Sequence, residues 1–199
     1  KIKREDKWSG GLLSTIAQAK HAGAYLSDDE CVALATQIFV AGNETTTSLI
    51  SNLVWRLLTN QGLWDKLCKR EIDTDDAINE SLRFDPPLLG LFKTTSREVI
   101  IDNVKIPAGT KVMMHYGAAN RDPNVFESPH LFNVKRNGKK QLSFSIGLHV
   151  CLGRELAKLE ARVALNALRE KFPDLTLLGD GERVGPFLFW GRARLPVSH

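Results

Sequence analysis

The sequence predicts a mainly α-helical fold of the α+β class, with one long helix, small β-hairpins, a long loop and a final long helix. Two observations predict the helices: no proline occurs before Pro86, and none occurs between Gly153 and Phe172. A third predicts the hairpins, because β-branched residues gather in short runs that Pro, Gly and Asn separate. Proline ends helices and short β-branched runs favour strands, so the pattern indicates helices on either side of a small amount of sheet.

The first long helix is predicted to begin at Ser27. Ser27 and Glu30 have the spacing of a capping box, in which two side chains satisfy the free amides at a helix start. The first strong break after it is the segment 59–62, Thr-Asn-Gln-Gly. The helix should therefore contain about 30 residues and measure about 45 Å, which is long enough to cross a domain.

Two further helices are predicted from their caps and from the prolines that stop them. One runs from about 74 to 84, capped by Asp73 or the threonine after it, and must end before Pro86. The other runs from about 153 to 172, with leucines and valine at helical spacing, and ends at Pro173.

The sheet is predicted between these helices. Segments 98–104 and 111–116 are rich in apolar and β-branched residues and flank the turn 106–109, so we expect them to pair as a hairpin. The stretch 117–148 contains Pro, Asn, Asp and Gly throughout and should form a long ordered loop, which usually serves a site. Short strands are expected in the tail, 187–197.

Composition excludes several classes of protein. The 199 residues carry 27 Lys and Arg against 23 Asp and Glu, a net charge of +4 too evenly spread to favour nucleic acid. The apolar runs are too short to cross a membrane, and no signal peptide is visible. Three cysteines without CxxC spacing argue against a disulfide framework, so a cytoplasmic setting is expected. We expect one domain over residues 1–199, with further chain before the charged stretch that begins at Lys1.

The most specific motif lies between the loop and the last helix. Residues 144–153 read FSIGLHVCLG, and five of them fit the pattern F-x-x-G-x-H-x-C-x-G, which arises by chance with a probability on the order of 10⁻⁵. Alone, Cys151 would be read as a buried structural thiol and His149 as an ordinary histidine. Zinc shared by the two would need two further ligands nearby. The five-residue context favours a thiolate ligand at a helix N-terminus, whose dipole stabilises the anion.

This motif resembles the haem-binding loop of the cytochrome P450 family, and the whole chain is similar to the C-terminal half of its soluble bacterial members. The resemblance implies haem b as cofactor and Cys151 as the ligand of its iron, since a thiolate donates electron density that favours O–O cleavage. It also assigns roles beside the thiolate. Phe144 shields the sulfur, Gly147 permits the turn, His149 donates to a haem propionate, and Gly153 lets the helix approach the porphyrin.

A second segment, Ala-Gly-Asn-Glu-Thr-Thr-Thr at 41–47, places Gly and β-branched residues inside the first long helix, where they are unfavourable. It is similar to the family's A-G-x-(D/E)-T-T segment, in which the helix passes over the haem at Ala41 and Gly42. The resemblance implies that Glu44 supplies protons and Thr45 organises their delivery to dioxygen. The alternative is a polar helix face on which Gly42 serves close helix packing.

A third set implies a structural role. Glu80 and Arg83 match the family's E-x-x-R pair, which a second arginine completes, here Arg136. Three buried charges are tolerable only when mutually paired, so this triad should be structural. Lys93 stands where relatives usually place an arginine that binds a haem propionate; it supplies the charge but not the two-pronged geometry.

Together the resemblance implies a monooxygenase that inserts one oxygen atom from dioxygen into a small apolar organic substrate. The alternatives are a truncated haem-binding fragment without catalytic activity and a peroxygenase, against which Thr45 argues. Electrons would come from a ferredoxin or flavodoxin type donor. Acidic donors would meet the basic residues near the thiolate, although these could equally serve solubility; they are Lys135, Lys139, Lys140 and Arg154. No nucleic acid or membrane is expected as a partner.

Overall fold

The computed structural model describes residues 10–136, 140–185 and 187–199. The chain divides into two compact units, residues 1–44 and 45–199, each of which is described by itself. The charged stretch at the start of the chain lies outside the described residues. A single domain over the whole chain stays a prediction.

The first unit contains a short helix, α1 (Leu12–Gln18), a two-stranded hairpin and the first part of α2 (Asp28–Thr59). The hairpin pairs β1 (Lys20–His21) with β2 (Ala24–Tyr25) in antiparallel register. The Cys31 thiol is buried and donates a hydrogen bond to the Ile16 carbonyl at 3.6 Å. Neither α1 nor the hairpin was predicted, because both are too short to show a periodic pattern of apolar residues.

The predicted capping box at the start of α2 is confirmed. The Ser27 amide donates to Glu30 Oε2 at 2.7 Å, and the Glu30 amide donates to Ser27 Oγ at 3.2 Å. The Ser27 amide and, to a lesser extent, the Ser27 hydroxyl donate hydrogen bonds to the Glu30 carboxylate and lower the pKa of this carboxyl. The helix contains 32 residues, close to the predicted length.

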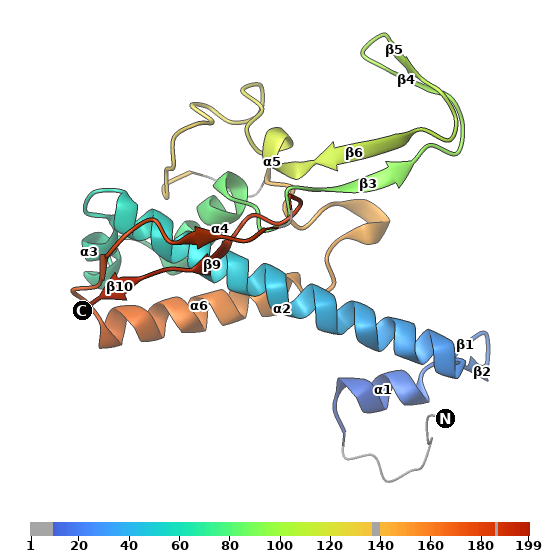
Figure 1. Cartoon of the computed structure of the whole chain (residues 1–199), viewed down its shortest axis with the longest axis horizontal. Helices are drawn as coiled ribbons and strands as arrows, with labels where there is room; N and C mark the ends of the chain where they lie inside the picture. Colours follow the sequence, from blue (N-terminus) through green and yellow to red (C-terminus); the bar gives the residue numbers. More distant parts are fainter. Residues whose placement is uncertain (1–9, 137–139, 186) are drawn as a thin grey trace. The chain divides into compact units, whose positions relative to one another are not determined.

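Four helices of the second unit share one apolar core. The last turns of α2 contribute with α3 (Leu63–Cys68), α4 (Thr74–Phe84) and α6 (Arg154–Lys171) (Figure 1). Burial of their apolar side chains supplies the main stabilisation of such a unit. The fully or nearly fully buried members include Leu49, Leu53, Leu57, Trp64, Leu67, Ile78, Leu82, Ala161, Leu165 and Leu175.

Both shorter helices agree with the sequence prediction. The Asp73 carboxylate caps α4 by accepting the amides of Asp75 and Asp76 at 2.8 and 3.1 Å. The helix ends at Phe84, two residues before Pro86, and α6 ends at Lys171, two residues before Pro173. Local signals at both ends thus fixed the extent of these helices.

The predicted hairpin between 98–104 and 111–116 is wrong. Instead β4 (Val99–Ile101) pairs with β5 (Val104–Ile106), while β6 (Lys111–His115) pairs with β3 (Gly90–Thr94). Figure 1 shows the small β4–β5 hairpin at the far end of the longer β3–β6 pair. Asp102 and Asn103 take φ angles of 44° and 65°, as a tight two-residue turn requires, and Asp and Asn tolerate this conformation.

The long loop is mostly irregular in its described part, as predicted, and contains α5 (Tyr116–Ala119) and a short 3₁₀ helix, η2 (Gly147–His149). Short strands in the tail are confirmed as β9 (Arg192–Arg194) and β10 (Val197–Ser198). They pair with two strands not predicted, β8 (Glu182–Arg183) and β7 (Thr176–Leu177) respectively. Among the described residues, no helix combines the length and the apolar character needed to cross a membrane.

Replacing Gly191 with Ala is expected to destabilise the second unit by about 1–3 kcal/mol, the usual cost of overpacking. A Cβ at this position would clash with the Ser48 side chain and lie 2.9 Å from Ser48 Cα on α2. Ser48 is buried and has no room to move away. Urea unfolding should reveal the loss, whereas Gly179→Ala, where an added Cβ meets no atom within 4 Å, should leave the midpoint nearly unchanged. Equal midpoints for the two variants would contradict the packing argument.

Candidate functional site

The loop that carries the predicted thiolate is closed by its own backbone. The Ser145 amide donates to the Leu142 carbonyl at 2.8 Å, and the Cys151 amide donates to the Phe144 carbonyl at 2.9 Å. Ser145 and Gly147 both lie in the left-handed region, with φ of 60° and 71°. Gly147 adopts this conformation without strain, whereas Ser145 adopts it in spite of its side chain. The loop therefore forms its turn with a serine in the left-handed region at position 145.

Cys151 lies immediately before the N-terminus of α6. Gly153 is the N-cap residue and has no side chain that could cap the helix. The first backbone hydrogen bond of the helix runs from the Ala157 amide to the Gly153 carbonyl at 2.9 Å. The three amides before Ala157 therefore have no intrahelical acceptor. Together with the helix dipole they make this end of α6 favourable for a negative charge, and the exposed side chain of Cys151 lies three residues before the helix begins.

Several large apolar side chains near Cys151 in the chain are exposed. Leu148 and Leu152 are 95% and 96% exposed, and Ile146 and Leu156 are also exposed. An exposed cluster of large apolar residues marks a binding surface. Among the described residues no group of three or more His, Cys, Asp or Glu could hold a bare metal ion. One thiolate within an apolar surface thus fits a metal carried by a flat apolar macrocycle, as haem is.

The other predicted loop residues lie as follows. Phe144 is half-buried and packs against the apolar core, with Lys158 Nζ 6.0 Å from its ring centre. His149 is exposed at the end of η2. An added Cβ on Gly153 would meet no atom within 4 Å, so the space beside the helix start is open. Lys93 is exposed on β3, opposite Val112 of β6.

The predicted oxygen-side residues are consecutive on α2 but divide between the units. Ala41, Gly42 and Glu44 belong to the first unit, and Thr45 is the first residue of the second. Thr45 is half-buried, and Glu44 is exposed. The roles of Glu44 and Thr45 in proton delivery, and of Ala41 and Gly42 beside the haem, stay predictions.

The structure brings Glu80, Arg83 and Arg136 together. Arg83 donates from Nη2 to Glu80 Oε1 at 2.7 Å and from Nε to Oε2 at 2.8 Å, and both side chains are 0% exposed. Arg136 Nε lies 3.5 Å from Glu80 Oε2, an ion pair without hydrogen-bond geometry. The remaining donors of Arg83 reach the carbonyls of Asn120, Pro129 and Leu131. Every charge of the buried pair therefore has a partner, as its burial requires.

Sequence reasoning missed two buried polar side chains that join segments far apart in the chain. Asp85, 1% exposed, accepts hydrogen bonds from Arg56 Nη2 at 3.2 Å and from Trp190 Nε1 at 2.9 Å, so it connects α2 with the tail. Asn120, 0% exposed, contacts the residues just before the thiolate loop. The sequence offers little signal for either residue: Asn120 lies within the long loop 117–148, and Asp85 is the residue before Pro86.

The basic residues near the thiolate are exposed where the structure describes them. These are Lys135, Lys140 and Arg154, of which Arg154 contacts Glu155 Oε1 at 2.9 Å. Lys139 lies outside the described residues. Their role in meeting an electron donor stays a prediction.

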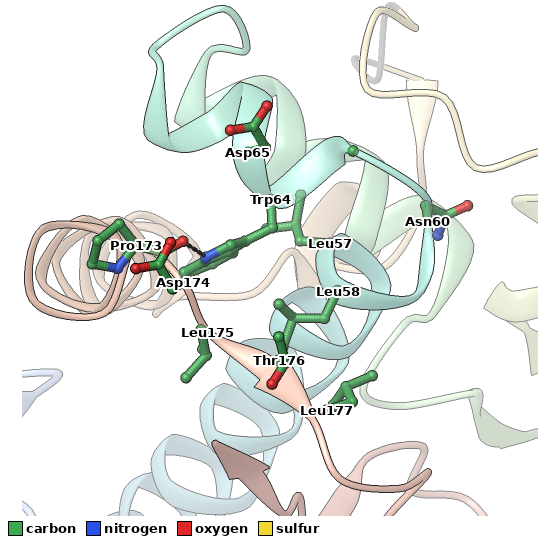
Figure 2. Close-up of a pocket in the computed structure, with 11 residues that line it drawn as sticks. Leu57, Leu58, Asn60, Trp64, Asp65, Pro173, Asp174, Leu175, Thr176 and Leu177 are labelled. Atoms are coloured by element: carbon green, nitrogen blue, oxygen red, sulfur yellow. Dashed lines mark hydrogen bonds between the residues drawn. The ribbon is translucent and has the colours of Figure 1, made fainter. Parts of the chain in front are cut away.

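A cavity of about 420 Å³ lies where the end of α2, the start of α3 and the segment after α6 meet (Figure 2). Its described lining includes Leu57, Trp64 and Leu175, and Trp64 Nε1 donates to the Pro173 carbonyl at 2.9 Å. None of the predicted site residues belongs to the described lining of this cavity.

Comparison with known proteins points to one family. The family model described as Cytochrome P450 matches residues 74–173. The putative cytochrome P450 YjiB of Bacillus subtilis is 35% identical over 172 residues, 86% of this chain and 43% of that protein. Cytochrome P450 107B1 of Saccharopolyspora erythraea is 37% identical over 193 residues, 94% of this chain and 47% of that protein.

Solved structures give the same result. The post-tailoring hydroxylase HmtN, involved in himastatin biosynthesis, superimposes with a TM-score of 0.89 at 32% identity and covers 96% of this chain. P450BioI, solved with an acyl carrier protein that bears hexadec-9Z-enoic acid, gives 0.83 at 37% identity over 87% of this chain. The chain covers 52% and 45% of those two structures. It thus spans about half the length of the proteins that it matches, and the fold class predicted from its sequence is confirmed.

Proposed function

This chain belongs to the cytochrome P450 family, and we propose that it supplies the haem-binding and oxygen-activating residues of a monooxygenase. Members of the family bind haem b. The reaction that we propose inserts one atom of dioxygen into a small apolar organic substrate. One observation carries the proposal: an exposed cysteine lies within an apolar surface at the N-terminus of a long helix, where a thiolate is stabilised.

The residues that would hold haem are those of the thiolate loop and of β3. Cys151 would bind the iron through its sulfur, and the exposed side chains of Leu148 and Leu152 would offer apolar contacts to the macrocycle. His149 and Lys93 supply a hydrogen-bond donor and a positive charge for the propionates. When bound, haem supplies a redox-active iron whose thiolate ligand favours cleavage of the O–O bond.

Protons for the reaction come from α2 in this proposal. The Glu44 carboxylate is exposed, so its side-chain oxygens would accept protons from solvent and pass them on. The Thr45 hydroxyl both donates and accepts, so it can order a water molecule that passes the proton on.

Electrons come from a separate protein, and a ferredoxin or flavodoxin type donor fits the charges present. Lys135, Lys140 and Arg154 give the described surface around the thiolate loop a positive character. An acidic partner is attracted to such a surface before it docks. The rate of reduction should therefore fall as salt concentration rises.

The proposal is tested with ¹⁸O₂ on the haem-loaded protein, a ferredoxin and its reductase, and a panel of apolar substrates. We expect a thiolate-ligated spectrum of the reduced CO complex and a product that carries one ¹⁸O atom. A thiolate spectrum without any oxygenated product would support the alternative of a haem-binding protein without activity. Absence of the thiolate spectrum would refute the haem assignment itself.

Replacing Thr45 with Ala is expected to divert electrons from product into hydrogen peroxide. The methyl group of alanine cannot order the water that carries the proton, so the product formed per electron consumed should fall on the order of tenfold. Parallel measurement of product and peroxide checks this. Thr47→Ala, two residues further along the same helix, is the matched control and should stay coupled. Tight coupling in Thr45→Ala would contradict the relay.

A further inference from the structure

We propose that Asn120 is a positioning residue for Cys151: it fixes the backbone that leads into the thiolate loop. Asn120 follows α5 and is fully buried, 22 residues before the leucine whose backbone amide it binds. It touches neither the thiol nor the proposed haem surface. Its effect on the cysteine passes through Leu142 and Ser143.

The Asn120 side chain makes two hydrogen bonds to these consecutive residues. Its Oδ1 accepts the Leu142 amide at 2.7 Å, and its Nδ2 donates to Ser143 Oγ at 2.9 Å. Ser143 Oγ in turn donates to the Leu82 carbonyl on α4 at 2.6 Å. A carboxamide offers a donor and an acceptor at once, whereas an ionised Asp only accepts and a Leu does neither. The side chain thus matches both groups that it meets.

The hydrogen bonds continue from there to the cysteine. The Leu142 carbonyl accepts the Ser145 amide at 2.8 Å, and the Phe144 carbonyl accepts the Cys151 amide at 2.9 Å. Residues 142–145 therefore form the fixed end from which the loop returns to Cys151. A displacement at Leu142 would shift the acceptor on which the Cys151 amide depends.

The backbone of Asn120 is held from the other side by the buried ion pair. The Asn120 carbonyl accepts Arg83 Nη1 at 2.9 Å, and Glu80 fixes the same guanidinium with two hydrogen bonds. The Asn120 amide donates to the Tyr116 carbonyl at 2.8 Å. Buried polar groups that are fully paired adopt few alternative arrangements, so Asn120 provides a rigid link from α4 to the loop.

Amide hydrogen exchange on the protein that contains this chain tests the link without any cofactor. In Asn120→Ala the amides of Leu142 and Cys151 should exchange about tenfold faster or more, because the Leu142 amide loses its acceptor. Amides of the α4 and α6 core, such as those of Ile78 and Leu165, should keep their protection. Ser143→Ala removes the hydrogen bonds of Ser143 Oγ to Asn120 and Leu82 but leaves the Leu142 amide its acceptor, so it should give a smaller change in the same amides.

The control is Asn124→Ala, which removes an exposed carboxamide four residues further along. It should leave exchange in the loop unchanged. Unchanged exchange at Cys151 in Asn120→Ala, with the core still protected, would overturn the inference. An equal acceleration in loop and core would also overturn it, because Asn120 would then stabilise the unit in general.

A second measurement, which rests on the proposed function, follows the iron ligand in the haem-loaded protein. Asn120→Ala should lower the share of the reduced CO complex that shows the thiolate band, at equal haem content, whereas Asn124→Ala should not. Suppose that the unchanged protein shows the thiolate band and that Asn120→Ala alters neither the band nor the amide exchange. This result would refute the positioning role and leave the proposed function intact. Faster loop exchange in Asn120→Ala, with no thiolate band even in the unchanged protein, would support the positioning role and refute the function.

Discussion

Replacing Cys151 with Ser is expected to abolish the red-shifted absorption band of the reduced, CO-bound protein and all monooxygenase activity. A serine hydroxyl does not ionise near neutral pH, so the charge and polarisable sulfur that tune the iron are both lost. The change replaces one atom, sulfur by oxygen, in an exposed side chain and should leave the fold intact. Absorption spectroscopy with carbon monoxide under reducing conditions measures the band directly.

The two other cysteines serve as matched controls. Cys31 is buried in the first unit and Cys68 is half-buried at the end of α3, and burial raises the pKa of the Cys68 thiol. A raised pKa keeps this thiol protonated near neutral pH, which makes it a poor metal ligand. Cys31→Ser and Cys68→Ser should therefore keep the band. A band that persisted in Cys151→Ser, or that disappeared in Cys68→Ser, would refute the ligand assignment.

Replacing Arg83 with Met is expected to cost about 3–5 kcal/mol of unfolding free energy, because it leaves the Glu80 carboxylate buried without its main partner. Arg83 donates two hydrogen bonds to Glu80 and further ones to backbone carbonyls of the loop. These carbonyls would also lose their donor. The loss is comparable with the total stability of many domains. Urea unfolding followed by circular dichroism gives the free energy.

An exposed ion pair of the same chemistry provides the comparison. Arg162 donates to both carboxylate oxygens of Asp75 at 2.7 and 2.9 Å, but its side chain is 39% exposed. Water solvates both charges when this pair is broken, so Arg162→Met should cost about 1 kcal/mol or less. Similar losses of unfolding free energy for Arg83→Met and Arg162→Met would contradict the argument that burial makes the Glu80–Arg83 pair costly to break. Adding Glu80→Gln to Arg83→Met should recover part of the loss.

The thiolate loop shows how far sequence reasoning reached at the site. The spacing of Phe144, Gly147, His149, Cys151 and Gly153 indicated a ligand at a helix start, and α6 begins one residue after Gly153. The left-handed conformation of Ser145 was not predicted, because serine rarely adopts it. Nor could spacing reveal Asn120, whose partners lie 22 and 23 residues away in the chain.

What the sequence by itself determined are features that neighbouring residues decide among themselves. The capping box of Ser27 and Glu30, the Asp73 cap and the prolines after α4 and α6 act within a few residues, so they fix helix ends in any tertiary context.

Only the tertiary structure decided which distant segments meet. β6 pairs with β3 and not with β4 or β5. The turn at Asp102 and Asn103 lets β4 and β5 pair with each other instead. Likewise Glu80 and Arg83 would form a weak surface pair on an isolated helix, and the loop that covers them makes the pair indispensable. Strand pairing and burial depend on contacts between residues far apart in the chain, and the spacing of neighbouring residues does not predict those contacts.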